Sequence, residues 1–188
     1  LILNQDGTVN LMTGATEIGQ GADTAFAQMV SETLGVAYEN IHVISTQDTD
    51  ITPWDPGAYA SRQTYTCAPA VHAVADGLRR KLLGYPAALT IAPTAQGDAV
   101  VFVRNPESVV VTLHDLAMDS FYNKDRGGQL SAEASFKTRQ NPPSFGGCFA
   151  EVEVDIDLCK VRITHILNVH DAGVIINPAL ATAQVHGG

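Results

Sequence analysis

The sequence is short of basic residues. Lysine and arginine together number 11 against 20 aspartates and glutamates, which gives a formal net charge of −9 over 188 residues. A chain without a basic surplus cannot neutralise a phosphate backbone or an anionic membrane surface over a wide area. We therefore expect no nucleic acid and no membrane as partners, and any bound anion must be held by local groups.

Long hydrophobic runs and paired cysteines are also missing. No apolar run approaches the roughly 20 residues that cross a bilayer, and no charged-then-apolar leader opens the chain. The three cysteines, Cys67, Cys148 and Cys159, have no CxxC spacing, which favours ordinary buried, reduced thiols over disulfides. These features predict a cytoplasmic protein.

Several catalytic motifs are absent too. The six histidines form no HExxH pair, and the aspartates at 48, 50 and 55 lack the glycine and glutamate of a calcium loop. Ser61 does not lie in a Gly-x-Ser-x-Gly elbow, which argues against a nucleophile. The residues themselves favour neither a metal site nor covalent catalysis.

The hydrophobic periodicity alternates between strand and helix. With 45% hydrophobic residues the chain can bury on the order of two thirds of its unfolded surface. The pattern predicts an α+β fold of mixed α/β lobes, with antiparallel strand pairs and helices. We expect residues 1–188 to be a fragment of a larger domain. A connection between its lobes is possible near 122–147, where Gly, Pro and Asn are frequent.

The first half of the chain gives four expected elements. They are a hairpin over 1–13 around Asp6-Gly7, a helix capped by Asp23 or Thr24 and ended by Gly35, a strand over 41–44, and a helix over 61–83. Pro69 is acceptable in the first turn of that last helix, or it marks a kink if the helix starts earlier.

The second half gives three further groups. They are strands over 99–103 and 109–111 joined through Asn105-Pro106, with a short helix over 113–121; an antiparallel pair over 149–156 and 160–169; and a helix that begins at Asn177-Pro178.

Three segments share one design, in which a polar or glycine-rich loop leads into a helix. They are Gly14 to Gly21, Gly57 to Thr64, and Asn177 to Gln184. A helix start exposes unpaired N–H groups and a partial positive charge, so it binds phosphate even in an acidic protein. Neutral hydrogen-bonding side chains at these points suit a polar heterocycle. Glu17 is interpreted as a partner of the helix dipole and not as a catalytic base.

These segments carry a family resemblance. Gly14 to Gly21 resembles the Gly-x-Thr-Glu-x-Gly-Gln-Gly loop of the molybdenum hydroxylases of the xanthine dehydrogenase type. Thr52 to Arg62 resembles their Gly-x-x-x-Ser-Arg cofactor loop, and 149–155 is similar to the strand ahead of their third site. Asp171 to Pro178, followed by Gln184-Val185-x-Gly187, is also similar. The matches follow the family order along nearly the whole chain.

The resemblance implies a set of cofactor contacts. It places Gln20, with backbone from Gly19 and Gly21, against molybdopterin or its phosphate, and Gln184 against the pterin. It places Ala60, Ser61, Arg62 and Gln63 around the phosphate or the nucleotide of molybdopterin cytosine dinucleotide. For Arg62 two partners stay open, a diphosphate or a surface carboxylate. Molybdenum is anchored by the pterin in this family, so no protein metal ligand is expected.

The resemblance also implies what the chain lacks. The family's catalytic glutamate lies in a Gly-Glu-Pro motif, which does not occur in these 188 residues. We therefore expect no catalytic residue here, an inactive isolated chain, and a fragment completed by the remaining lobes of a molybdenum subunit. Iron–sulfur clusters and FAD are expected on other domains or subunits, and a purine such as xanthine or hypoxanthine as the substrate.

Two alternatives remain open at this point. The chain could be a free-standing nucleotide or phosphoester-binding module that uses the same helix starts without redox chemistry. Within the family, the parent could be an aldehyde or carbon monoxide dehydrogenase, because the substrate residues mostly lie outside this chain.

Overall fold

The computed structural model describes residues 1–188 except 47, 85–87, 105–106 and 141. The chain divides into two compact units, Leu1–Lys137 and Thr138–Gly188, which are described separately below. The division falls inside the range 122–147, where a connection between lobes is expected. The linker expected at Asn105-Pro106 lies outside the described residues.

The first unit begins with a three-stranded sheet. Strand β1 (Ile2–Leu3) pairs antiparallel with β2 (Val9–Met12), and β3 (Ile41–Ile44) lies parallel to β2 on its other side. Gly7 has a φ of +88°, as the tight turn requires. The predicted hairpin and the predicted strand over 41–44 are both confirmed.

Helix α1 (Ala22–Leu34) connects β2 to β3 through a short 3₁₀ turn, η1 (Tyr38–Asn40). Its apolar face is buried, and Gly35 ends it in the left-handed conformation with a φ of +86°. The predicted N-cap at Asp23 or Thr24 is wrong, because the N-cap is Gly21, two residues before Asp23. The physical reason is the carboxylate of Glu17, which accepts hydrogen bonds from the N–H groups of Gly21 and Asp23.

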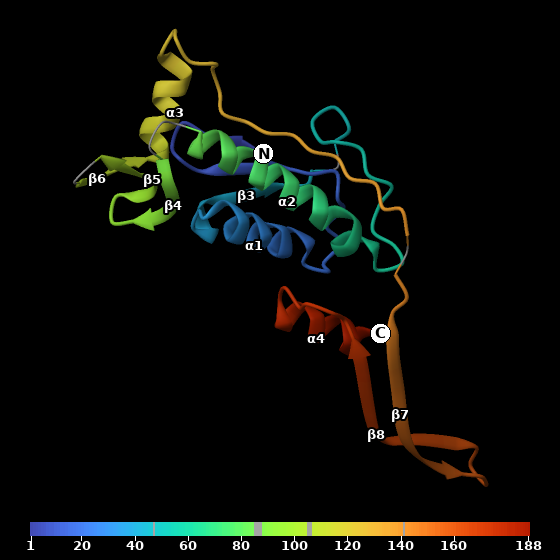
Figure 1. The fold of residues 1–188 in the computed structure, drawn as a ribbon. Helices are drawn as coiled ribbons and strands as arrows, with labels where there is room; N and C mark the ends of the chain where they lie inside the picture. Colours follow the sequence, from blue (N-terminus) through green and yellow to red (C-terminus); the bar gives the residue numbers. More distant parts are fainter. Residues whose placement is uncertain (47, 85–87, 105–106, 141) are drawn as a thin grey trace. The chain divides into compact units, whose positions relative to one another are not determined.

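Helix α2 (Arg62–Leu83) lies beside α1 (Figure 1). The predicted apolar face is confirmed, since Val71, Val74, Leu78 and Leu82 are all buried. Pro69 lies inside the helix, beyond the first turn in which it would cost no hydrogen bond. The helix therefore continues past a residue without an N–H group because tertiary packing of its apolar face holds it.

A second sheet follows in the order β4 (Ala88–Thr94), β5 (Gly97–Arg104) and β6 (Glu107–Thr112), all antiparallel, and leads into α3 (Leu113–Tyr122). Strand β4 was not predicted, because its Ala- and Pro-containing sequence lacks a clear alternation. Asp98 on β5 is 6% exposed and accepts hydrogen bonds from the Ala37 N–H (3.1 Å) and from Asn40 Nδ2 (2.8 Å). These bonds tie β5 to η1.

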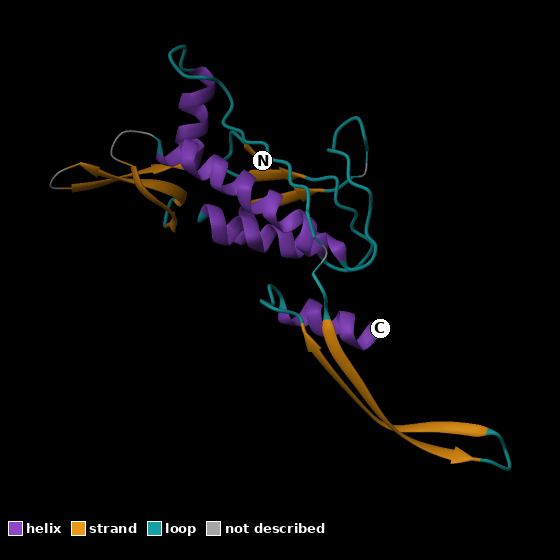
Figure 2. Ribbon diagram, turned by 45° about the vertical axis from the view of Figure 1, so that its right-hand side comes forward, coloured by secondary structure: helices purple, strands orange, loops and turns teal. Residues whose placement is uncertain are grey.

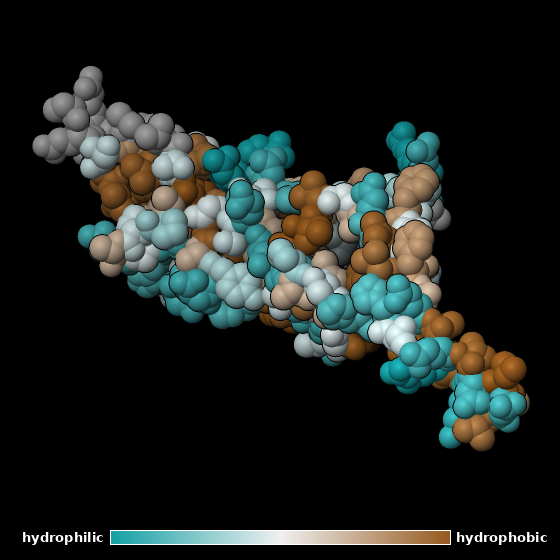
Figure 3. Space-filling view, turned by 90° about the horizontal axis from the view of Figure 1, so that it is seen from below, coloured by the Kyte–Doolittle hydropathy of each residue, from teal (hydrophilic) through white to brown (hydrophobic). Residues whose placement is uncertain are grey.

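The second unit is a hairpin of β7 (Phe145–Asp155) and β8 (Lys160–Asp171), followed by α4 (Pro178–Gly187). The predicted strand pair and helix are confirmed, and β7 begins four residues earlier than expected. Figure 2 shows the long twisted strands, and Figure 3 shows polar and apolar side chains side by side along this arm. Cys148 and Cys159 are exposed here, so the expectation of buried thiols is wrong for them.

No helix within the described part of the chain is long and apolar enough to cross a membrane.

Candidate functional site

Two loops meet at one edge of the first sheet. The first loop is the segment 13–21 before α1, and the second loop is the segment 48–61 before α2. Because β2 and β3 are parallel neighbours, both strands end at the same edge, where the segments toward α1 and α2 begin. Gly14 lies so close to the second loop that an added β-carbon would be 1.9 Å from the carbonyl oxygen of Pro53. The absence of a side chain at Gly14 therefore allows the two loops to touch.

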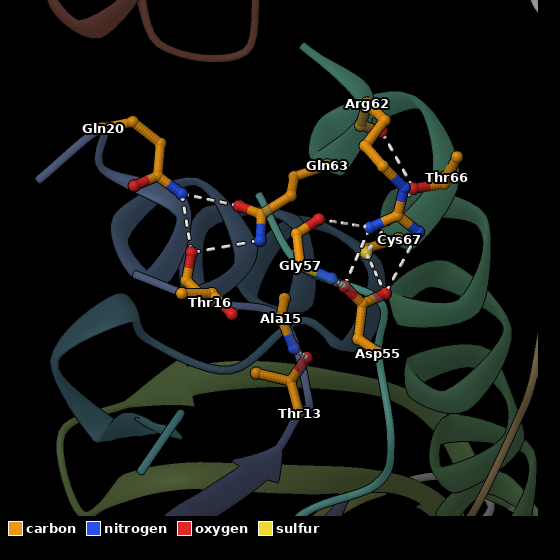
Figure 4. Close-up of polar contacts among 10 residues, drawn as sticks. All are labelled: Thr13, Ala15, Thr16, Gln20, Asp55, Gly57, Arg62, Gln63, Thr66 and Cys67. Carbon is orange, nitrogen blue, oxygen red and sulfur yellow. Dashed lines mark hydrogen bonds and ion pairs between the residues drawn. The ribbon is translucent and has the colours of Figure 1, made fainter. Parts of the chain in front are cut away.

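A pair of glutamine amides joins the first loop to the start of α2 (Figure 4). Gln20 Nε2 donates to the Oε1 of Gln63 (2.5 Å) and to the carbonyl oxygen of Thr16 (2.9 Å). Gln63 Nε2 donates to the same Thr16 oxygen (3.0 Å), and the Ile18 N–H donates to Gln20 Oε1 (2.7 Å). Two of the predicted site residues, 43 positions apart, are thus in direct contact.

Glu17 closes the start of α1. One carboxylate oxygen accepts from the N–H groups of Gly19 (2.7 Å) and Gly21 (3.1 Å), and the other from the N–H of Asp23 (3.0 Å). Burial alone would raise the pKa of Glu17, but the backbone donors outweigh it and hold the pKa below its ordinary value. The interpretation of Glu17 as a dipole partner is confirmed in atomic detail.

A second carboxylate lies next to Glu17. Asp23 accepts a hydrogen bond from the Ser45 hydroxyl (2.7 Å), while its Oδ1 is buried without a partner among the described residues. Burial raises the pKa of Asp23, repulsion from Glu17 raises it further, and the bond from Ser45 opposes both. The pKa values of the two neighbouring carboxylates are therefore shifted in opposite directions, down for Glu17 and up for Asp23.

We predict that Glu17→Gln lowers the free energy of unfolding at neutral pH by about 1 kcal/mol, because an amide N–H₂ would face the Asp23 N–H. Since folding lowers the pKa of Glu17, its stabilisation is present above the ordinary glutamate pKa of about 4.3 and is lost as pH falls through the lower folded value. Thermal unfolding of both proteins from pH 7 to pH 3 measures this. A difference that stays constant over the range would contradict it.

The second loop is held by an ion pair. Arg62 donates from Nη1 to Asp55 Oδ1 (2.8 Å) and from Nη2 to Oδ2 (3.1 Å), and Nη1 also donates to the Gly57 carbonyl (2.8 Å). The two side chains are 18% and 13% exposed. Hydrogen bonds with Asp55 raise the pKa of Arg62. Of the two partners left open for Arg62, the structure shows a carboxylate of its own loop.

Ala60 and Ser61 give the start of α2 an unusual conformation. Both adopt left-handed backbone angles, with φ of 50° and 53°, although neither is glycine. Within the described residues, no side-chain hydrogen bond caps this helix, and Ser61 is exposed. Residues other than glycine in this strained conformation are concentrated at functional sites in proteins. The Arg62 N–H donates to the carbonyl oxygen of Tyr59 (3.1 Å), so this helix start is closed by backbone and not by a carboxylate as in α1.

A groove of about 710 Å³ lies beside the second loop, within the usual range for small-molecule pockets. Its walls come from β2, the loop around 50–55, α2 and the segment 131–136, and they include Thr13, Asp55, Arg62, Cys67 and Phe136. Burial raises the pKa of the Cys67 thiol, so this half-buried cysteine is a thiol at neutral pH.

The remaining predicted site residue, Gln184, is exposed on α4 in the second unit. That helix begins at Pro178, and the side chain of its N-cap Asn177 accepts from the Leu180 N–H (3.1 Å), as predicted. No cluster of three metal-ligating side chains is found in the described ranges of the chain.

Sequence reasoning missed the supporting residues Gly14, Thr16 and Asp55. Gly14 and Thr16 belong to the glycine-rich segment, but the tight approach to Pro53 and the use of the Thr16 carbonyl depend on tertiary contacts. For Asp55, the available signal is a carboxylate seven residues before an arginine in a short loop.

The chain is similar to known proteins over its whole length. A model of the molybdopterin cofactor-binding domain family matches residues 1–188. The chain is 56% identical to the putative xanthine dehydrogenase molybdenum-binding subunit of Escherichia coli (strain K12), covering 100% of this chain and 26% of that protein. It is 32% identical to the probable hypoxanthine oxidase of the same organism, with 98% and 19% covered.

The fold has solved counterparts as well. Reconstituted CO dehydrogenase from Oligotropha carboxidovorans superimposes with a TM-score of 0.77 at 23% identity, covering 100% of this chain and 24% of that one. At this identity the likeness concerns the fold alone, and it confirms the predicted α+β class. The chain spans about a quarter of the length of the relatives that it matches.

Proposed function

This chain belongs to the molybdopterin cofactor-binding domain family, and we propose that it holds the pterin and phosphate of the cofactor where its first two loops meet. The observation that carries the proposal is the contact between Gln20 and Gln63. Each amide oxygen accepts one described bond and keeps a second lone pair, which suits the N–H donors of a pterin.

The start of α2 suits the phosphate. Its N–H groups carry a partial positive charge, and the side chain of Ser61 leaves them uncapped. We propose that Ala60, Ser61 and Gln63 surround the phosphate or an appended cytosine nucleotide. Arg62 contributes by fixing the loop through Asp55, because its guanidinium is already paired.

The other resemblance-based contacts are proposed with one refinement. Gly19 and Gly21 flank Gln20, but their N–H groups already donate to Glu17. We therefore propose that these two glycines shape the loop against the pterin and do not donate to an anion. Gln184 is proposed as a pterin contact from α4. When bound, the molybdenum–pterin group supplies the hydroxylation chemistry, with oxygen derived from water.

For the whole protein we propose a xanthine dehydrogenase type of molybdenum oxidoreductase that hydroxylates a purine in the cytoplasm. The 56% identity over the full chain supports this over an aldehyde or carbon monoxide dehydrogenase, since the carbon monoxide dehydrogenase large chain of Afipia carboxidovorans is 27% identical. The family match over 1–188 also favours it over a free-standing phosphoester module.

The partners of the chain follow from this proposal. They are the remaining lobes of the molybdenum subunit, and iron–sulfur clusters and FAD on other domains or subunits, which receive the electrons. The catalytic glutamate is proposed to lie in one of those other lobes, so the chain of 188 residues alone is expected to be inactive.

In the full-length protein that carries this chain, Gln20→Ala is expected to lower the pterin and molybdenum content after purification by about tenfold, because it removes the donor to the Gln63 amide oxygen and a proposed pterin contact. Gln96→Ala is the matched control, since Gln96 is exposed in the turn between β4 and β5. Pterin fluorescence after oxidation and elemental analysis measure both. Normal contents in Gln20→Ala would contradict the assigned role.

A further inference from the structure

The starts of the three loop-linked helices differ in what satisfies their N–H groups. Asn177 caps α4 with its own side chain, and Glu17 brings a carboxylate back onto the start of α1. At α2, no side-chain hydrogen bond to the cap is found among the described residues. The start of α1 therefore has an anion of its own in Glu17, whereas the carboxylate near α2, Asp55, is already paired with Arg62.

The bonds of Glu17 bracket Gln20. The same carboxylate oxygen accepts from Gly19 (2.7 Å) and Gly21 (3.1 Å), the residues on either side of it. Both glycines have positive φ, 96° and 83°, so the backbone here has a wide choice of conformations until something fixes it. Three charge-assisted bonds to one side chain are strong enough to select one of them.

The selected conformation determines where the Gln20 amide points. With the loop closed over Glu17, Gln20 Nε2 reaches both the Thr16 carbonyl and Gln63 Oε1 on α2. A rotation of the Ile18–Gly19 peptide or of the Gln20–Gly21 peptide would break a bond to Glu17. The carboxylate therefore controls the glutamine pair through the backbone, without touching either glutamine amide.

We propose that Glu17 is a positioning residue: a built-in anion that fixes the Gly19–Gln20–Gly21 backbone for cofactor binding and keeps the cofactor phosphate away from the start of α1. This inference rests on the proposed function of the two loops. It assigns the phosphate to the α2 side by exclusion, because a second anion at α1 would meet the charge of Glu17.

The first test uses the full-length protein that carries this chain, with acetate as a probe. Glu17→Ala should open a carboxylate-sized site, so 100 mM acetate should raise its Tm by several degrees relative to 100 mM chloride, while the natural protein responds equally to both salts. Glu32→Ala is the control, because Glu32 is exposed near the other end of α1. An equal acetate response in all three proteins would overturn the proposed role of Glu17 as a built-in anion.

The second test measures pterin content in the full-length protein. Glu17→Gln keeps the side-chain shape and should retain about tenfold less pterin, the usual scale for loss of a residue that orients a cofactor contact. Glu32→Gln should retain the natural amount. If Glu17→Gln folds poorly, Glu17→Ala purified with acetate and with chloride replaces it, and only acetate should restore pterin.

The outcomes separate the two proposals. If Gln20→Ala loses pterin and Glu17→Gln keeps it, the positioning role is wrong and the proposed function stands. If both variants keep pterin, the proposed function fails at this loop and the positioning role fails with it. Loss in both, with the acetate response confined to Glu17→Ala, is the result that we expect.

Discussion

Replacing Gly14 with alanine is expected to lower the free energy of unfolding by about 3 kcal/mol, at the upper end of what overpacking costs. The new β-carbon would lie 1.9 Å from the Pro53 carbonyl oxygen and 3.0 Å from the Asp55 nitrogen. These are backbone atoms of the second loop, which cannot rotate away as a flexible side chain can. The two loops would have to separate, so we also expect the contact between Gln20 and Gln63 to be lost.

Gly127→Ala provides the control for Gly14→Ala. Among the described atoms nothing lies within 4 Å of a β-carbon at Gly127, and its φ is not positive, so this change should stay within about 0.5 kcal/mol. Urea unfolding of the chain, followed by circular dichroism, measures both variants. Equal stability of the two variants would show that the close approach of the loops does not exist in solution.

The second large effect is expected for Asp55→Asn, which removes the charge that faces Arg62. Breaking a buried pair costs about 3 to 5 kcal/mol, and the partial exposure of this one reduces our expectation to about 2 kcal/mol. The freed guanidinium would also become available to anions. We therefore expect inorganic phosphate to raise the Tm of Asp55→Asn more than that of the natural chain.

Asp76→Asn is the matched control for this change, because Asp76 pairs with Arg80 at 2.8 Å on the exposed face of α2, where the side chains are 48% and 74% exposed. Asp76→Asn should lower the free energy of unfolding by no more than about 0.5 kcal/mol. Calorimetry with and without phosphate distinguishes the two sites. If Asp55→Asn behaves like Asp76→Asn, the pair does not hold the second loop.

Much of the fold was predictable because it depends on local rules. The burial of Leu78 and Leu82 follows from helical spacing, and the end of α1 at Gly35 follows from the need for a left-handed residue there. The Asn177 cap and the long hairpin strands also follow from short-range pattern. Strand β4 did not, because its pairing with β5 compensates for a sequence with weak strand preference.

The candidate site was predictable only as separate loops. Sequence placed a polar side chain at each helix start, but the distance between Gln20 and Gln63 depends on the parallel pairing of β2 and β3. The capping of α1 was misassigned for a similar reason. Asp23 matches the usual cap pattern, yet Glu17 accepts from the N–H groups of Gly21 and Asp23 from inside the loop, so the helix begins before Asp23, which a linear pattern does not show.

The most direct test is a crystal structure of the full-length protein with its cofactor bound. We predict that the pterin lies within about 3 Å of the amide of Gln20 or Gln63, that the phosphate lies at the start of α2 beside Ser61, and that Glu17 still holds Gly19 and Gly21. A phosphate bound to the first turn of α1 in place of Glu17, or a pterin that touches neither glutamine, would contradict the account.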